Sequence, residues 1–96
     1  MISHSVIFIL SHPKGSIGEV DFFLAAAKLA HIPGVKNFEI LKQTSPTNKY
    51  EYGIVMQFVN SKIYKEYSDH PDHKLFIQEY WINGVMDFLE IDFNPF

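Results

Sequence analysis

The hydrophobic positions of the chain alternate between a strand-like and a helical spacing. Residues 4–10 are apolar at almost every position, which predicts a strand with His4, Val6 and Phe8 on one face and Ile7 on the other. A loop rich in proline and glycine follows, after which apolar residues recur at helical spacing. We therefore expect a strand followed by an amphipathic helix.

Local signals set the expected bounds of this helix and of the hairpin after it. Ser16 and Glu19 have the spacing of a capping box, and Pro33 disfavours helical geometry at the residue before it, so the helix should end just ahead of that proline. Residues 35–42 and 50–59 predict two strands. The short polar segment between these strands predicts that they pair as a hairpin.

The remainder of the chain predicts a broken helix and a last strand. Asn60 is a suitable N-cap, and His70–Pro71 should interrupt the helix that begins there. We expect Asp72 to cap a second short helix that runs through Trp81. Apolar residues alternate again from 85 to 93, which predicts the final strand.

The predicted order of elements is β-α-β-β-α-β. This order is typical of an α+β, ferredoxin-like sandwich, in which helices cover one face of a four-stranded antiparallel sheet. No repeat, linker or low-complexity segment divides the chain. We therefore expect a single domain over residues 1–96.

The first and third predicted strands are apolar on both faces, whereas helices can cover only one face of the sheet. The uncovered face needs another apolar surface, and the simplest source is a second copy of the chain related by two-fold symmetry. The pattern thus predicts a homodimer through the sheet faces, with the architecture of a dimeric α/β barrel.

Composition and charge exclude several classes of partner. The chain has 96 residues, 47% of them hydrophobic, and a net charge of −3 with no cluster of basic residues, so we expect no nucleic-acid partner. It contains no cysteine, which excludes disulfides and thiolate chemistry. The N-terminal apolar run is too short for a signal peptide or a membrane span, and we expect a cytoplasmic protein with no membrane partner.

The most promising candidate chemistry lies on either side of the break in the second helix. Tyr67 ends one helical segment and His73 begins the next, so both side chains can reach one cavity. A neutral histidine, with an ordinary pKa of about 6.5, is a suitable general base, and a tyrosine hydroxyl can donate to a developing enolate oxygen. The alternative is that His73 caps its helix and Tyr67 is a packed core aromatic.

Other polar residues invite a weaker hypothesis. His4 lies on the apolar face of its strand, as either a core or a pocket residue, and His70 should be exposed or bonded to backbone. Asp69, His70, Asp72 and His73 are residue types that bind metals, but the histidines flank a proline bend and have no marked distant partner. We therefore expect no metal site.

Three segments resemble a known family. They are His4 near the start of the first strand, the Ile32–Val35 turn, and the run Tyr67-x-x-His70-Pro71-x-His73 followed by Phe76. Together they resemble the stress-responsive α/β-barrel (Dabb) domain family over nearly the whole chain. The family's ferredoxin-like dimeric barrel agrees with the fold expected from the hydrophobic pattern.

The resemblance also implies roles for individual residues. Members of the family include plant stress proteins and a polyketide cyclase that performs an aldol-type ring closure. By similarity to that cyclase, Tyr67 and His73 would be catalytic. His4, Phe23 and Phe76 would then line the substrate pocket.

Three functions remain open. The first is a cofactor-free acid–base enzyme acting on a small carbonyl or polyketide-like compound; no glycine-rich phosphate loop is present, and we expect no cofactor. The second is a non-catalytic stress-responsive or ligand-binding dimer, and the third is a cofactor-free monooxygenase of the same fold. Two aromatics of the similar cyclase are replaced here, at Ala26 and near Gly84, which implies a pocket of different shape.

Overall fold

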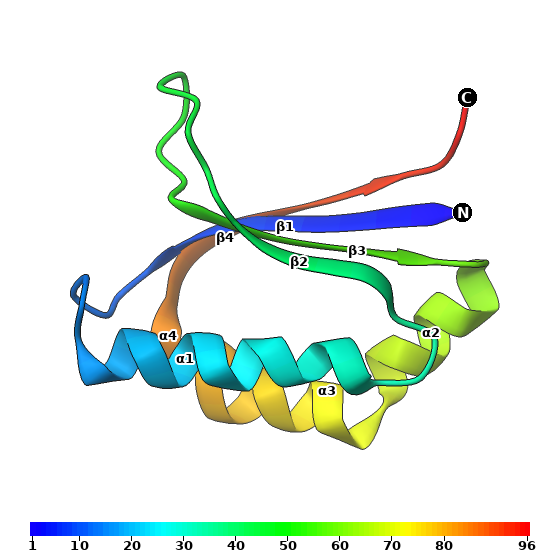
Figure 1. Ribbon diagram of the computed structural model, residues 1–96, viewed down its shortest axis with the longest axis horizontal. Helices are drawn as coiled ribbons and strands as arrows, with labels where there is room; N and C mark the ends of the chain where they lie inside the picture. Colours follow the sequence, from blue (N-terminus) through cyan, green and yellow to red (C-terminus); the bar gives the residue numbers. More distant parts are fainter.

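A computed structural model describes residues 1–96 and shows a four-stranded antiparallel sheet with all the helices beneath one of its faces (Figure 1). The sheet order is β2-β3-β1-β4, so β1 and β3 are central and β2 and β4 form the edges. This is the predicted ferredoxin-like α+β fold. The strand bounds are β1 Ile2–Leu10, β2 Lys36–Lys42, β3 Tyr52–Phe58 and β4 Val85–Phe93.

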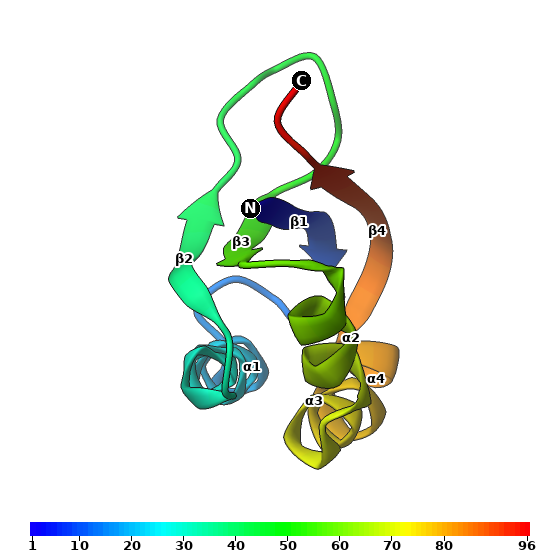
Figure 2. The same ribbon diagram turned by 90° about the vertical axis from the view of Figure 1, so that its right-hand side faces the viewer.

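The helices form two parallel rows under the sheet (Figure 2). One row is α1 (Ile17–Ala27), which tightens into the 3₁₀ segment η1 (Lys28–His31). The other begins with α2 (Ser61–Asp69) and, after a bend, continues as α3 (Pro71–Phe76), the π-helical segment η2 (Ile77–Trp81) and α4 (Ile82–Gly84). None of these helices has the length and apolar character needed to cross a membrane.

Two of the helix starts follow the predicted capping rules. The Ser16 side chain accepts a hydrogen bond from the Glu19 backbone N–H at 3.2 Å, and the Asn60 side chain accepts one from Ile63 at 2.9 Å. The Glu19 carboxylate completes its half of the box one residue early, because it accepts from the N–H of Gly15 at 3.0 Å.

The start of α3 differs from the prediction. The N-cap is His70 rather than Asp72, because the His70 imidazole Nδ1 accepts the backbone N–H of Asp72 at 3.1 Å. Pro71 takes the first helical position, where its missing N–H costs no hydrogen bond. The prediction that His70 bonds to backbone is therefore confirmed, whereas the predicted cap at Asp72 was wrong.

The core fills the space between the sheet and the helices. Its fully buried large side chains are Phe8, Phe22, Ile54 and Phe58. They come from β1, α1 and β3, so the two central strands and the first helix supply most of the packing. The predicted inward face of the first strand is confirmed, since His4 is also buried on this side.

The opposite face of the sheet carries apolar residues that nothing in the chain covers (Figures 1 and 2). The strand register pairs Ile7 with Leu89 and aligns Val55 and Ile91 through their shared neighbour Ser5, so these side chains lie on one face. Three of them are half-buried by their neighbours, and Leu89 is exposed.

Candidate functional site

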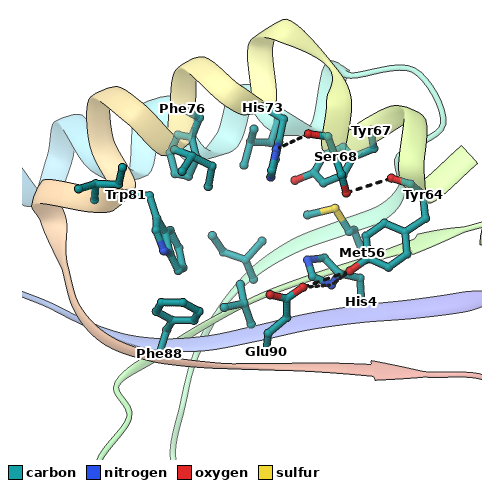
Figure 3. Close-up of a pocket in the computed structure, with 15 residues that line it drawn as sticks. His4, Met56, Tyr64, Tyr67, Ser68, His73, Phe76, Trp81, Phe88 and Glu90 are labelled. Atoms are coloured by element: carbon teal, nitrogen blue, oxygen red, sulfur yellow. Dashed lines mark hydrogen bonds and ion pairs between the residues drawn. The ribbon is translucent and has the colours of Figure 1, made fainter.

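A cavity of about 400 Å³ lies between the sheet and the second row of helices (Figure 3). It is mostly apolar, and its polar side chains gather toward one end. Such a cavity matches the usual form of a small-molecule site, in which a few polar groups orient a ligand inside an apolar pocket. Its lining residues are His4, Val6, Leu29, Ile54, Met56, Tyr64, Tyr67, Ser68, His73, Phe76, Ile77, Trp81, Ile82, Phe88 and Glu90.

His73 lies in the first turn of α3 and points down into this cavity (Figure 3). Its Nδ1 lies 3.1 Å from the backbone carbonyl oxygen of Ser68. A carbonyl can only accept, so Nδ1 carries the proton and the neutral ring offers its Nε2 lone pair. Burial lowers the pKa of His73, and this favours the neutral ring at physiological pH. The bond to Ser68 therefore leaves a basic nitrogen on the cavity side.

Tyr67 lies in the last turn of α2, with its ring against the imidazole of His73. The two ring centroids are 4.7 Å apart, at an angle of 53°. The Tyr67 side chain is buried, yet its hydroxyl makes no hydrogen bond to the protein, and every fully buried polar side-chain atom has a partner. The hydroxyl oxygen is thus accessible from the cavity. Burial raises the pKa of Tyr67, so the hydroxyl keeps its proton and remains a donor.

His4 is the third polar group of the pocket and comes from β1. Its Nδ1 lies 2.6 Å from a carboxylate oxygen of Asp92, which sits opposite it in the β1–β4 register. A carboxylate accepts, so Nδ1 of His4 also carries a proton, and Nε2 is the nitrogen left without a protein partner. Figure 3 shows this ring edge turned toward the cavity.

Tyr64 connects these groups at the polar end of the cavity. Its hydroxyl lies 2.7 Å from Nδ1 of His4, 2.9 Å from Asp92 and 3.3 Å from Glu90. Desolvation and the two neighbouring carboxylates raise the pKa of Tyr64, so it stays protonated as well. Its ring stacks on Phe58 with the centroids 4.8 Å apart. The contact of the Tyr64 hydroxyl with Nδ1 therefore helps to fix the orientation of the His4 ring.

The apolar end of the cavity is aromatic. Trp81 meets Phe88 edge-on with a centroid distance of 5.5 Å, and Phe76 lies behind the tryptophan at 6.3 Å. Trp81 ends the π-helical segment η2, and π-helical turns occur frequently at functional sites. The wider turn sets the direction of Trp81 relative to the residues of α3.

The structure brings together four of the five residues that the sequence singled out. Tyr67, His73, His4 and Phe76 all line the cavity. Phe23 does not line it. It packs edge-on against Tyr52, with the centroids 5.0 Å apart.

Two functional candidates were missed by sequence reasoning. The sequence did not single out Glu90 or Asp92, whereas the structure places both partly exposed side chains on the helix side of β4 beside His4. The signal was present, because both alternate with Leu89 and Ile91 on the last strand. The ferredoxin-like order also makes the last strand a neighbour of the first.

His4, Glu90 and Asp92 together have the residue types of a cation site. His4, Glu90 and Asp92 each place a possible ligand atom within 4.8 Å of the others. However, the nitrogen of His4 in this group is Nδ1, which donates to Asp92. A bound metal would have to replace that hydrogen bond.

Comparison with known proteins gives the following matches. The family model described as the Stress responsive A/B Barrel Domain (Dabb) matches residues 2–95. A Dabb family protein of ferredoxin-like fold from Mesorhizobium loti has a TM-score of 0.96 at 43% identity, over 99% of this chain and 96% of that one. No curated protein matches the chain.

Two more distant structures share the fold. A dimeric ferredoxin-like protein of unknown function from Thermobifida fusca has a TM-score of 0.80 at 22% identity, over 98% of this chain and 90% of that one. A hydroxynitrile lyase from Passiflora edulis has a TM-score of 0.82 at 11% identity, over 96% and 90%. At these identities the likeness concerns the fold alone.

Proposed function

The chain belongs to the stress-responsive A/B barrel (Dabb) domain family, and we propose that it is a cofactor-free acid–base enzyme acting on a small carbonyl compound in the helix–sheet pocket. His73 is the general base and Tyr67 is the hydrogen-bond donor to the carbonyl oxygen. The reaction begins with removal of a proton from the carbon next to the carbonyl.

The observation that carries this proposal is the pairing of two cavity-accessible polar groups that make no hydrogen bond to the protein. Nε2 of His73 and the hydroxyl of Tyr67 both lack a protein partner, and their rings are in contact. A histidine with a merely structural role would satisfy both nitrogens, and a structural tyrosine buried this deeply would bond its hydroxyl. A ligand carbonyl can accept from Tyr67 while its neighbouring carbon faces His73.

The tautomer and the charge of each group suit this chemistry. Burial lowers the pKa of His73, so the ring is neutral and can accept a proton near pH 7. Tyr67 stays protonated and can stabilise the oxygen on which negative charge develops. His4, fixed by Asp92, supplies a second free ring nitrogen that can hydrogen-bond a ligand or a water molecule.

We also propose that the protein works as a homodimer through the sheet faces. The support is the apolar face that carries Ile7, Val55, Leu89 and Ile91, together with the dimeric description of the Thermobifida fusca neighbour. Burying these side chains against a second copy would remove them from water. The proposed chemistry needs no residue from the second copy, because the cavity is lined by the helices and by the helix-facing side of the sheet.

The named activity of the Passiflora edulis neighbour shows that this fold can hold an enzyme. At 11% identity that name does not extend to the present chain. The proposal therefore rests on the geometry of His73 and Tyr67.

The test is proton exchange at the α carbon of a probe ketone. 2-Acetylnaphthalene is incubated with the protein in D₂O, and loss of its methyl proton signal is followed by NMR. We expect His73→Ala to lower the protein-dependent exchange rate by about 100-fold or more, and Tyr67→Phe by about 10- to 100-fold. His31→Ala is the matched control, because His31 is exposed on η1 and should leave the rate unchanged.

Two results would contradict the proposal. Exchange that survives in His73→Ala would remove the histidine from its role as base. Binding of the ketone without any exchange would instead identify a ligand-binding dimer of the same family.

A further inference from the structure

The polar end of the cavity has two carboxylates beside it, and the only basic side chains there are the histidines His4 and His73, with His4 paired to Asp92. Glu90 lines the cavity, and the carboxylate of Asp92 lies directly behind His4. No lysine or arginine lines the cavity. The lysine nearest in sequence to the pocket residues of α2, Lys65, is bonded to Asp69 at 2.7 Å.

The charge of Glu90 acts on the two groups that would bind a carbonyl. It contributes to the raised pKa of Tyr67 and works against the lowering of the pKa of His73. At His73 the contribution of Glu90 is opposed by that of His4, whereas at Tyr67 Glu90 is the one charged group that contributes to the raised pKa. A ligand carboxylate placed against Tyr67 would meet the same repulsion.

Neutral ligands do not meet this penalty. Transfer of a proton from a neutral ketone to neutral His73 forms an imidazolium and an enolate together, so the net charge of the site stays constant. Glu90 favours the imidazolium and Tyr67 bonds the enolate oxygen. At the other end, Trp81, Phe88 and Phe76 offer aromatic edges and faces to an apolar group.

We infer that Glu90 makes this pocket selective for neutral carbonyl compounds that carry an aromatic group, and against carboxylates of the same shape. The carbonyl lies between Tyr67 and His73, and the aromatic group lies beside Trp81. This inference rests on the proposed function for the placement of the carbonyl. Its test measures only binding, so the two can fail independently.

The experiment compares a matched pair of probes, 2-acetylnaphthalene and 2-naphthoate, which differ mainly in a methyl group against a charged oxygen. Trp81 is the only tryptophan of the chain and lines the cavity, so its indole N–H signal in a ¹H–¹⁵N NMR titration reports occupancy of this site. We expect the ketone to bind about tenfold or more tightly than the carboxylate at low ionic strength.

The variant that tests the inference is Glu90→Gln, which keeps the shape of the side chain and removes its charge. We expect it to reduce the preference for the ketone by about threefold or more, through tighter binding of naphthoate. Glu66→Gln is the control, because Glu66 is exposed on α2 and does not line the cavity. Raising the salt concentration to about 0.5 M should narrow the preference of the unmodified protein as well.

Each remaining outcome would overturn the inference. Equal binding of the two probes shows that the pocket does not discriminate by charge, and binding of neither removes it as a site for aryl carbonyl compounds. An unchanged preference in Glu90→Gln, with the wild-type spread of NMR signals, shows that the discrimination has another origin. Survival of proton exchange in His73→Ala would refute the proposed base but would alter none of these binding ratios.

Discussion

Tyr64 and Tyr67 lie one turn apart on α2, and changing each to phenylalanine separates a structural hydroxyl from a free one. The hydroxyl of Tyr64 lies within hydrogen-bond distance of His4, Asp92 and Glu90. The hydroxyl of Tyr67 has no protein partner. The same chemical change therefore removes a bonded network at one position and only a cavity-facing donor at the other.

The expected magnitudes follow from these contacts. Hydrogen bonds to charged groups contribute about 1.5–3 kcal/mol, and the carboxylates beside Tyr64 are partly exposed, which reduces this to about 1–2 kcal/mol for Tyr64→Phe. Tyr67→Phe removes a hydroxyl that has no protein partner, so it should change the free energy of unfolding by less than about 0.5 kcal/mol. Catalysis should respond to Tyr67→Phe, with the rate loss expected above.

The assay is urea unfolding of both variants at one protein concentration, since a dimer's stability depends on concentration. With a slope of about 1.5 kcal/mol per molar urea, Tyr64→Phe should lower the midpoint by about 1 M. Tyr67→Phe should leave the midpoint almost unchanged. Equal destabilisation by the two variants would show that the Tyr67 hydroxyl is structural, and the proposed donor would be lost.

Three further outcomes are expected. Burial lowers the pKa of folded His73 below its unfolded value of about 6.5, so below that pH the native state binds fewer protons than the unfolded state. The protein should therefore lose stability as the pH falls from 7.5 to 5.5, measured by urea unfolding at both values. His73→Gln should lose less stability over the same range. Val55→Glu should convert the proposed homodimer to a monomer in sedimentation, whereas Leu24→Glu on the exposed face of α1 should not. Gly34→Ala should lower the free energy of unfolding by about 2–3 kcal/mol, because the φ of Gly34 is 91° and the Ile63 side chain of α2 lies where a Cβ would go. Gly15→Ala, with φ 78° and open space around it, should lower it by about 1–2 kcal/mol in the same urea-unfolding assay.

The hydrophobic pattern was enough to predict the layers of the fold. Alternation on the last strand gave its bounds at Val85–Phe93, and the two-sided apolar character of the central strands indicated which face would remain uncovered. These features depend on local spacing and on burial, both of which are visible in a single sequence. The capping signals at Ser16 and Asn60 were equally local.

The residues that were misplaced depend on tertiary information. Phe22 and Phe23 are adjacent on α1, and the helical pattern alone does not show how the helix is rotated about its axis. Phe22 enters the core and Phe23 packs against Tyr52. The role of Asp92 likewise needs the β1–β4 register, and the π-helical turn before Ile82 has no sequence signal of its own.

The break between α2 and α3 explains why the sequence run that resembles the family, Tyr67 to His73, also forms the candidate site. In an unbroken helix the N–H of Asp72 would bond the carbonyl of Ser68. Here Pro71 bends the chain, and the backbone N–H of Asp72 donates instead to the side chain of His70. The carbonyl of Ser68 therefore has no backbone donor. That carbonyl accepts Nδ1–H of His73 and so fixes the ring with Nε2 toward the cavity. The proline that interrupts the helix is therefore also the residue that sets the tautomer of the proposed base.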